Sequence, residues 1–418
     1  MLKTSKRNEY ELTAVPHSQR RSLIANILVW AGFPLVVTGA FLGGQITLAL
    51  GFKAAVTATL IGNLVLMIYV GLLSVIGSRS GQSFNLISKH VFGQQFSKWV
   101  SGFLSILVLG WFSVQTGMAG QGLENMLGWS AAATSLCLGF IFVGLSLLGI
   151  KALTYIGAAS VPFFLIIALI ALYYILKSSD ISSISNYTGQ PTAAWMSISI
   201  AITLVISLFI DSGTLTADFS RWTRSSQHAL IATACAFPLA NSLAMLLGIF
   251  TVASSMSQDG NFAALVAQHA PSLVIVTAMF FILNCASVTM HCLYNAATGC
   301  SGILRQPYWI MCLVFGTIAT LIAFFGVWDY LTQWLNFLGV LVPGIGGVVI
   351  SAMIMQPKSK ALPFAKIAFY SWLISILVAS LATYYVSSIS IAVVAMVVGA
   401  VAYQLLKHSY IQFSKEFA

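Results

Sequence analysis

The sequence predicts an all-α polytopic membrane protein with twelve transmembrane helices. Composition is the first reason: 59% of the 418 residues are hydrophobic and 7% are charged, whereas soluble domains carry roughly 25% charged residues. The second reason is that the apolar residues fall into runs of about 20, the length that a helix needs to cross a bilayer. The third is that the basic residues occupy alternate connections between these runs.

Twelve apolar runs follow one another along the chain and are numbered here as spans 1 to 12. In order they cover residues 24–50, 53–77, 97–121, 130–150, 153–176, 194–218, 228–253, 272–299, 308–327, 330–354, 364–386 and 388–406. They divide the chain into three predicted regions. These are a cytoplasmic N-terminal tail over residues 1–22, a transmembrane core of spans 1 to 10 over residues 23–355, and spans 11 and 12 with a short cytoplasmic tail over residues 356–418.

The basic residues also orient the chain in the membrane. With the N-terminus inside, 17 of the 19 Lys and Arg residues lie on the cytoplasmic side, and Lys53 and Lys177 lie outside. One missed or extra span would move every later loop to the opposite side of the membrane. The pattern therefore supports twelve spans with both termini in the cytoplasm, and we expect an integral protein of the plasma (inner) membrane.

Several function classes are excluded by the sequence. It contains no GxxxxGK[ST], HExxH or GxSxG motif, so it predicts neither an ATPase nor an enzyme, and no cofactor. The basic residues are scattered singly, which does not favour nucleic-acid binding. All six cysteines lie in apolar runs and form no Cys-x-x-Cys pair, so a zinc site or disulfide framework is not expected.

Spans 2 and 7 share a short internal match. Residues 60–67 (LIGNLVLM) and 238–245 (PLANSLAM) each place an asparagine, Asn63 or Asn241, among apolar residues at mid-span. The two spans lie five apart and run in opposite directions, so the match predicts a five-plus-five inverted repeat. The alternative is that each asparagine only joins neighbouring helices by hydrogen bonds.

The repeat makes spans 1 and 6 counterparts, and both contain residues that weaken a helix near mid-span. Span 1 has Gly32, Pro34 and three further glycines between residues 39 and 44, and span 6 has Asp-Ser-Gly-Thr at residues 211–214. Paired interruptions of this kind point to a binding site. Unwound backbone is tolerated at membrane depth only beside protein or a water-filled cavity.

Polar and aromatic side chains mark the same region. Asp211 lies near the middle of span 6, where a charge costs at least about 2.5–3.5 kcal/mol, so it is a functional candidate. The alternative is a structural acid satisfied by N–H groups of the broken helix. On span 8, Asn284 and His291 share one helix face with Ser287.

Five stretches resemble the cytosine permeases of the nucleobase–cation symport family. They are VPxSxR at 15–20, IGNL at 61–64, GWF at 110–112, GTLTADFxR at 213–221 and LY at 293–294. The likeness runs from the N-terminal tail through the last helix. It implies the twelve-helix inverted-repeat fold also seen in LeuT, with helices 1 and 6 broken. It also implies secondary-active import of a nucleobase by alternating access, driven by a cation gradient, with no obligate protein partner.

The resemblance also implies a set of site residues. A base would stack between Trp111 and Phe209 and contact the broken stretch of span 6. The implied base-binding positions are Trp111, Phe209, Asp211, Ser212, Gly213, Val108 and Thr289. A sodium ion would lie between spans 1 and 8, with the backbone carbonyls of Gly32 and Val36, together with Asn284, Ser287 and Val288, at its ligand positions.

Three positions depart from the family pattern. The family has a glutamine at the position of Val108, a serine at that of Asp211 and a threonine at that of Val288. An amide contact to the base and a hydroxyl ligand for sodium are therefore lost, while a buried acid is gained. We expect Asp211 to bind a ring N–H or amino group of a cytosine-like pyrimidine, and protons moving through Asp211, His291 or both to be an alternative to sodium.

Two alternatives stay open at this point. One is a transporter of a related heterocycle, such as hydroxymethylpyrimidine or a purine, with proton coupling. The other is a non-transporting membrane sensor built on a transporter fold.

Overall fold

The computed structural model describes residues 13–190, 196–354, 364–386 and 388–416. Within these ranges the chain is helical, and the only β-type pairing is an isolated bridge between Arg21 and Thr223. Residues 1–12 of the predicted tail and the predicted boundary between residues 355 and 356 lie outside the described residues.

The predicted spans correspond one to one with helices of the structure. Among the described residues, eight helices are long and apolar enough to cross a membrane, and four shorter apolar helices match the remaining spans. Spans 1 to 6 are α1 (Leu23–Gly32) with α2 (Val37–Leu50), α3 (Phe52–Ser80), α4 (Phe84–Leu127), α5 (Ala131–Leu147), α6 (Ile150–Ser178), and α8 (Ile198–Ser207) with α9 (Ile210–Thr214) and α10 (Ala217–Ser220). The all-helical fold is therefore confirmed, and the helices of the described residues agree with the predicted twelve spans.

Spans 7 to 12 complete the bundle. They are α11 (Ser226–Ala234) with η3 (Cys235–Asn241) and α12 (Ser242–Ala253), α14 (Val274–Leu304), α15 (Tyr308–Phe324), α16 (Leu331–Leu341) with α17 (Pro343–Ile354), α18 (Ala365–Tyr385) and α19 (Ile391–Glu416). Short helices also occur between the spans. They are η1 (His17–Gln19), α7 (Ile181–Ser185), α13 (Phe262–His269), η4 (Pro271–Leu273) and η5 (Val327–Tyr330).

Helix α4 is longer than the predicted span 3. It begins at Phe84, and Gly93 interrupts its helical backbone with φ 69° and ψ 174°. Glycine adopts this conformation without the penalty that a Cβ would bring. Residues 84–92 therefore form a separate helical stretch ahead of the membrane span, which hydropathy alone did not indicate.

Spans 1 and 6 are both broken at mid-span. In span 1, α1 ends at Gly32 and α2 begins at Val37, with Pro34 between them. A proline has no N–H to donate and clashes with the preceding turn, so the helix cannot continue through it. In span 6 the 10-residue α8 is followed by two helices of five and four residues. The predicted pair of broken helices is present.

The two halves of the repeat meet at the two matched asparagines. Asn241 Nδ2 donates to Asn63 Oδ1 at 2.8 Å, and both side chains are fully buried. Helix α4 packs against its counterpart α14, and α5 packs against its counterpart α15. The asparagines thus join two helices, and the helices that they join are equivalent elements of the inverted repeat.

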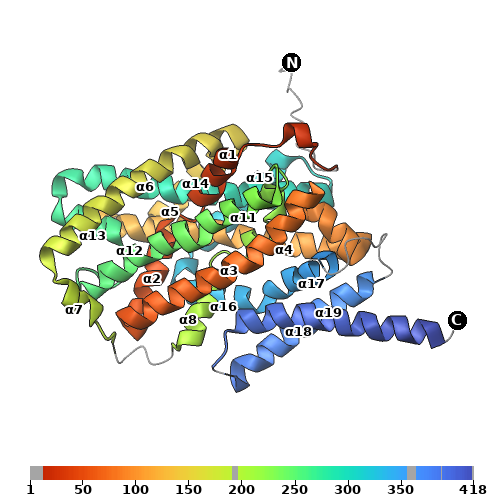
Figure 1. Cartoon of the computed structure of the whole chain (residues 1–418). Helices are drawn as coiled ribbons and strands as arrows, with labels where there is room; N and C mark the ends of the chain where they lie inside the picture. Colours follow the sequence, from red (N-terminus) through yellow and green to blue (C-terminus); the bar gives the residue numbers. More distant parts are fainter. Residues whose placement is uncertain (1–12, 191–195, 355–363, 387, 417–418) are drawn as a thin grey trace, which may run out of the picture.

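Figure 1 shows how the chain is arranged around this core. η1 and the C-terminal end of α19 lie toward the right of the view, whereas α7 and α13 lie toward the left. Helices α18 and α19 (blue) run along the lower edge of the bundle and pack against each other and against α17. The breaks of spans 1 and 6 lie inside the ten-span core, where residues from both line one cavity with residues of α4 and α14.

Candidate functional site

A small cavity lies where the breaks of spans 1 and 6 face α4 and α14. It is lined by Phe33, Val36, Thr38, Val108, Trp111, Gln115, Leu208, Phe209, Asp211, Ser212, Val288, His291, Cys292 and Asn295. The space within it that the centre of a water molecule can occupy is about 20 Å³, which is room for about one ordered water. A larger ligand therefore requires the walls to move apart.

Two helix faces supply half of the lining residues. Val108, Trp111 and Gln115 follow i, i+3, i+7 spacing on α4, which puts them on one face. On α14 the lining residues at positions 288, 291, 292 and 295 repeat the same pattern. The two equivalent helices of the repeat thus face the cavity together.

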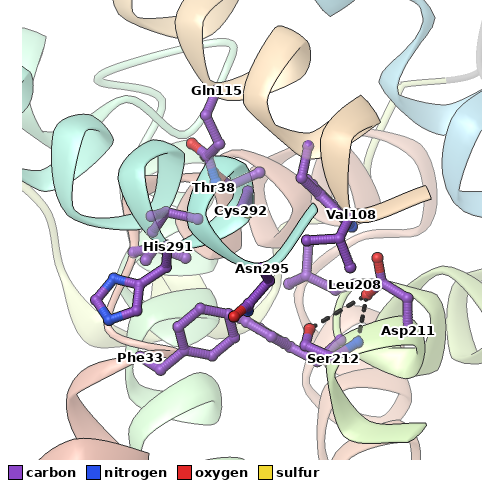
Figure 2. A pocket seen from close by; sticks show the side chains of 14 residues that line it. Phe33, Thr38, Val108, Gln115, Leu208, Asp211, Ser212, His291, Cys292 and Asn295 are labelled. Carbon is purple, nitrogen blue, oxygen red and sulfur yellow. Dashed lines mark hydrogen bonds between the residues drawn. The ribbon is translucent and has the colours of Figure 1, made fainter. Parts of the chain in front are cut away.

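Asp211 is the acidic side chain in the cavity wall, and it is fully buried. Its Oδ1 accepts from the backbone N–H of Ser212 at 2.7 Å and from the Ser212 hydroxyl at 3.2 Å, the two dashed bonds of Figure 2. Its Oδ2 accepts no well-aligned hydrogen bond from the described residues, and the Trp111 side chain is a polar group that interacts with this carboxyl. A buried polar atom left without a partner costs about 1–3 kcal/mol, more when charged, so Oδ2 is an acceptor available to a ligand.

A polar pair connects the second half of span 1, in α2, to span 3. Thr38 Oγ1 donates to Gln115 Oε1 at 2.9 Å, and both side chains are almost completely buried. Figure 2 shows the two side chains next to each other at one side of the cavity. Because the Gln115 carbonyl is occupied by Thr38, the amide offers its N–H groups to the cavity as donors.

Aromatic rings close the cavity on the side of α1. The ring centroids of Phe33 and Phe209 are 5.5 Å apart, and those of Phe209 and Phe237 are 5.7 Å apart. Trp30 stacks on Phe219 at 5.1 Å. Edge and offset contacts of this kind are favourable beyond their buried area, so the rings form a packed apolar floor.

His291 lies on the opposite side of Figure 2 from Asp211, with Asn295 labelled between them. His291 Nδ1 lies 2.7 Å from the backbone oxygen of Ser287. A carbonyl oxygen can only accept, so Nδ1 carries the proton and a neutral ring keeps Nε2 as an acceptor. The imidazole also meets the ring of Phe33 edge-on at 6.3 Å.

Not every residue implied by the resemblance lines the cavity. Gly213 packs behind it, where an added Cβ would lie 2.7 Å from Val70 Cγ2 of α3. Thr289 is buried and donates to the backbone oxygen of Cys285. Among the implied sodium positions, Val36 and Val288 line the wall. Gly32 instead faces Val161 of α6.

Asn284 lies beside the break of span 1 rather than in the wall. Its Oδ1 accepts from the N–H of Val37 at 3.0 Å, and its Nδ2 donates to the Leu35 oxygen at 3.0 Å and to Ser160 Oγ at 2.9 Å. Ser287 lies close by, with its hydroxyl 3.4 Å from where a Cβ on Gly157 would be. These two residues thus lie where spans 1, 5 and 8 meet.

Sequence reasoning missed several cavity residues. They are Phe33, Thr38, Gln115, Leu208, Cys292 and Asn295. One signal was available, because Gln115 follows Trp111 by four residues and so lies on the same face of α4. Cys292 and Asn295 lie on the same face of α14 as His291. The positions of Phe33, Thr38 and Leu208 depend on how the broken helices turn, which the sequence does not encode locally.

Paired helix breaks that enclose a polar cavity inside an inverted repeat define a membrane transporter. Residues 14–415 match the protein family described as "Permease for cytosine/purines, uracil, thiamine, allantoin". The chain belongs to this family, and it is a transporter rather than an enzyme.

Individual proteins show the same relationship. The chain is 27% identical to the cytosine permease of Escherichia coli K12 over 355 residues, which is 85% of this chain and 83% of that protein. Its fold is similar to that of Mhp1, a nucleobase-cation-symport-1 family transporter, in a closed conformation with bromovinylhydantoin bound. That match has a TM-score of 0.77 at 15% identity and covers 97% of this chain and 95% of that one.

A Na⁺-coupled sialic acid symporter has a related fold as well. Its TM-score is 0.67 at 13% identity, and the match covers 96% of this chain and 92% of that one. The inverted-repeat transporter fold predicted from the sequence is therefore confirmed over nearly the whole chain.

Proposed function

We propose that this chain is a secondary-active importer of a nucleobase or closely related heterocycle, with a cytosine-like pyrimidine favoured. Import would proceed by alternating access, and a cation gradient would supply the energy. The observation that carries the proposal is the buried Asp211 Oδ2, which accepts no well-aligned hydrogen bond from the described residues and faces a cavity with aromatic walls. A flat ring that carries N–H groups complements both features.

The chemistry of the wall supports a heterocycle over an aliphatic substrate. Trp111 and Phe209 offer ring faces, and stacking on such rings contributes about 0.5–1.5 kcal/mol beyond area burial. Asp211 offers a charged acceptor, and a hydrogen bond to a charged group contributes about 1.5–3 kcal/mol. Gln115 offers donors to a carbonyl or ring nitrogen. A base with adjacent N–H and C=O groups uses all of them.

Thermal unfolding of the purified protein in the presence of single bases tests the substrate class. A ligand at 100 times its Kd adds about 2.7 kcal/mol of stability, which shifts the midpoint measurably. We expect cytosine to give the largest shift. A larger shift with hydroxymethylpyrimidine or a purine would identify that class instead, and no shift with any heterocycle would favour a different function, such as a sensor.

Protons are the coupling ion that we favour, carried by Asp211, His291 or both. The ionised Asp211 accepts a hydrogen bond from the base, and the protonated Asp211 donates one instead. One charge moving through 100 mV supplies about 2.3 kcal/mol. At about 1.4 kcal/mol per tenfold change, this sustains roughly 50-fold accumulation of a neutral base. We expect Asp211→Asn to abolish uptake driven by a pH gradient in vesicles, and unchanged uptake would refute proton coupling through this residue.

We also propose that both termini are cytoplasmic. Basic residues support this, because Arg20 and Arg224 lie together at one end of the bundle: Arg20 Nη1 donates to the Ser78 oxygen at 2.7 Å, and Arg224 Nε donates to the Arg20 oxygen. An excess of Lys and Arg marks the cytoplasmic face. A C-terminal reporter that is fluorescent only in the cytoplasm checks the assignment, and a dark fusion would reverse it.

A further inference from the structure

The positions that the resemblance assigns to a sodium ion do not fit one well. A hard cation requires a shell of oxygen ligands. Val288 has no side-chain oxygen, and the carbonyl oxygen of Val36 accepts from the N–H of Gly39 at 3.1 Å. The side-chain oxygen of Asn284 accepts from the N–H of Val37. Val288 thus supplies no side-chain oxygen, and the oxygens of Val36 and Asn284 each already accept one hydrogen bond. The implied set then retains only the Gly32 carbonyl and the Ser287 hydroxyl, fewer oxygens than a hard cation requires.

Asn284 instead satisfies the backbone that the break of span 1 leaves unpaired. A helix end exposes N–H and C=O groups that need partners, and an unpaired group at membrane depth costs several kcal/mol. The amide oxygen binds the first N–H of α2, at Val37, and the amide nitrogen binds the Leu35 carbonyl. One side chain thus supplies both a donor and an acceptor to the broken stretch.

The same amide also reaches a third helix. Its nitrogen donates to Ser160 Oγ of α6 at 2.9 Å, and Asn284 and Ser160 are 1% and 4% exposed. A bound cation between these helices would join oxygens by its charge. The two N–H groups of the Asn284 amide likewise hold the oxygens of Leu35 and Ser160 together, by hydrogen bonds. Unlike an ion, the amide belongs to the chain and cannot dissociate.

We propose that the Asn284 carboxamide takes the place of a sodium ion in this transporter: it holds the break of span 1 against α6 and α14, so that binding and transport do not require sodium. The inference deepens the proposed transport function. Only the statement that transport does not require sodium rests on that function; the role of Asn284 at the break of span 1 does not. Since the amide is neither bound nor released, this junction cannot draw on a sodium gradient, and coupling must enter elsewhere.

Thermal unfolding of the purified full-length protein tests the proposal. Midpoints are compared in NaCl and in choline chloride at equal ionic strength, first without a base and then with cytosine. We expect the wild-type midpoint to be the same in both salts. A midpoint that rises with NaCl in a saturable manner overturns the proposal.

Two variants of Asn284 sharpen the test. Asn284→Ala removes all three bonds, and we expect a lower midpoint in both salts. Asn284→Asp keeps the bond from Val37 and can accept from the Ser160 hydroxyl, but it turns its second oxygen toward the Leu35 carbonyl, so two acceptors face each other there. We expect its midpoint to rise in NaCl relative to choline chloride, because a cation can then join these oxygens.

Asn63→Asp is the matched control, because Asn63 is also a buried asparagine that bonds to another span. We expect it to be destabilised without a sodium response. The proposal is overturned if Asn284→Ala unfolds at the wild-type midpoint, or if Asn284→Asp responds to sodium no more than Asn63→Asp does. Should either aspartate variant not fold, the wild-type salt comparison and Asn284→Ala still decide.

Failure of this inference is distinguishable from failure of the proposed function. The unfolding midpoints in NaCl and in choline chloride, compared without a base, report only on the contacts of Asn284 with span 1 and α6. If no heterocycle shifts the midpoint, the substrate class is refuted while the sodium result stands. If cytosine shifts the midpoint only in NaCl, the substrate class survives and the role of Asn284 is refuted.

Discussion

Replacing Asp211 by asparagine separates a ligand-binding role of this residue from a structural one. The side chain keeps its size and its carbonyl oxygen, which can still accept from the Ser212 N–H and hydroxyl. The other oxygen, which accepts no well-aligned hydrogen bond from the described residues, becomes an amide nitrogen. The substitution thus removes one acceptor and one charge and leaves the bonds to Ser212 in place.

The structure gives the expected magnitudes. Removing a charge from mid-span relieves at most about 2.5–3.5 kcal/mol, while a buried amide nitrogen without an acceptor costs about 1–3 kcal/mol. The two terms largely offset each other, so the stability of the ligand-free protein should change little. Affinity loses the charged hydrogen bond, about 1.5–3 kcal/mol, which is about a 12- to 150-fold rise in Kd at 1.4 kcal/mol per decade.

Thermal unfolding with and without the best-binding base measures both quantities on one sample. The expected result is a ligand-free midpoint close to that of the wild type, together with a weakened response to the base. The opposite pattern, a strongly lowered midpoint with an unchanged Kd, would show that Asp211 is a structural acid and would refute the reasoning.

Three further predictions concern packing and the cavity wall. Gly248→Val should prevent folding, since a Cβ there overlaps the backbone carbonyl of Ala40, and loss of monodisperse protein in size-exclusion chromatography checks this. Asn63→Ala and Asn241→Ala should each destabilise by about 0.6–1.7 kcal/mol, and the double variant should cost less than the sum; additive losses would argue against their hydrogen bond. Trp111→Ala should raise the Kd for the base about 2- to 13-fold from lost stacking by titration, whereas an unaltered Kd would place the base elsewhere.

Much of the fold could be predicted because it follows from composition along the chain. Span lengths depend on runs of apolar residues, and the break of span 1 depends on Pro34. Span 6 is interrupted on either side of the polar stretch 211–214, which itself lies in the short helix α9. The inverted repeat was readable from Asn63 and Asn241. The kinked start of α4 was not, because residues 84–92 lack both the length and the hydropathy of a span.

The candidate site was predictable only in part. Asp211 and His291 stand out because ionisable groups are rare in an apolar helix, whereas Trp111 and Phe209 were implied by the family resemblance; all four line the cavity. Gln115 escaped notice, although it lies one turn beyond Trp111, since a single glutamine in a membrane helix carries no sign of which way it faces.

By itself, the sequence determined which segments form the helical spans and that spans 1 and 6 are interrupted, because hydropathy and proline act locally. Only the tertiary structure decided which polar groups meet: Thr38 with Gln115, Asn63 with Asn241, and Asn284 with the backbone at Leu35 and Val37. The physical reason is that hydrogen bonds between spans depend on helix rotation and separation to within an ångström or so. Those quantities come from the packing of the whole bundle.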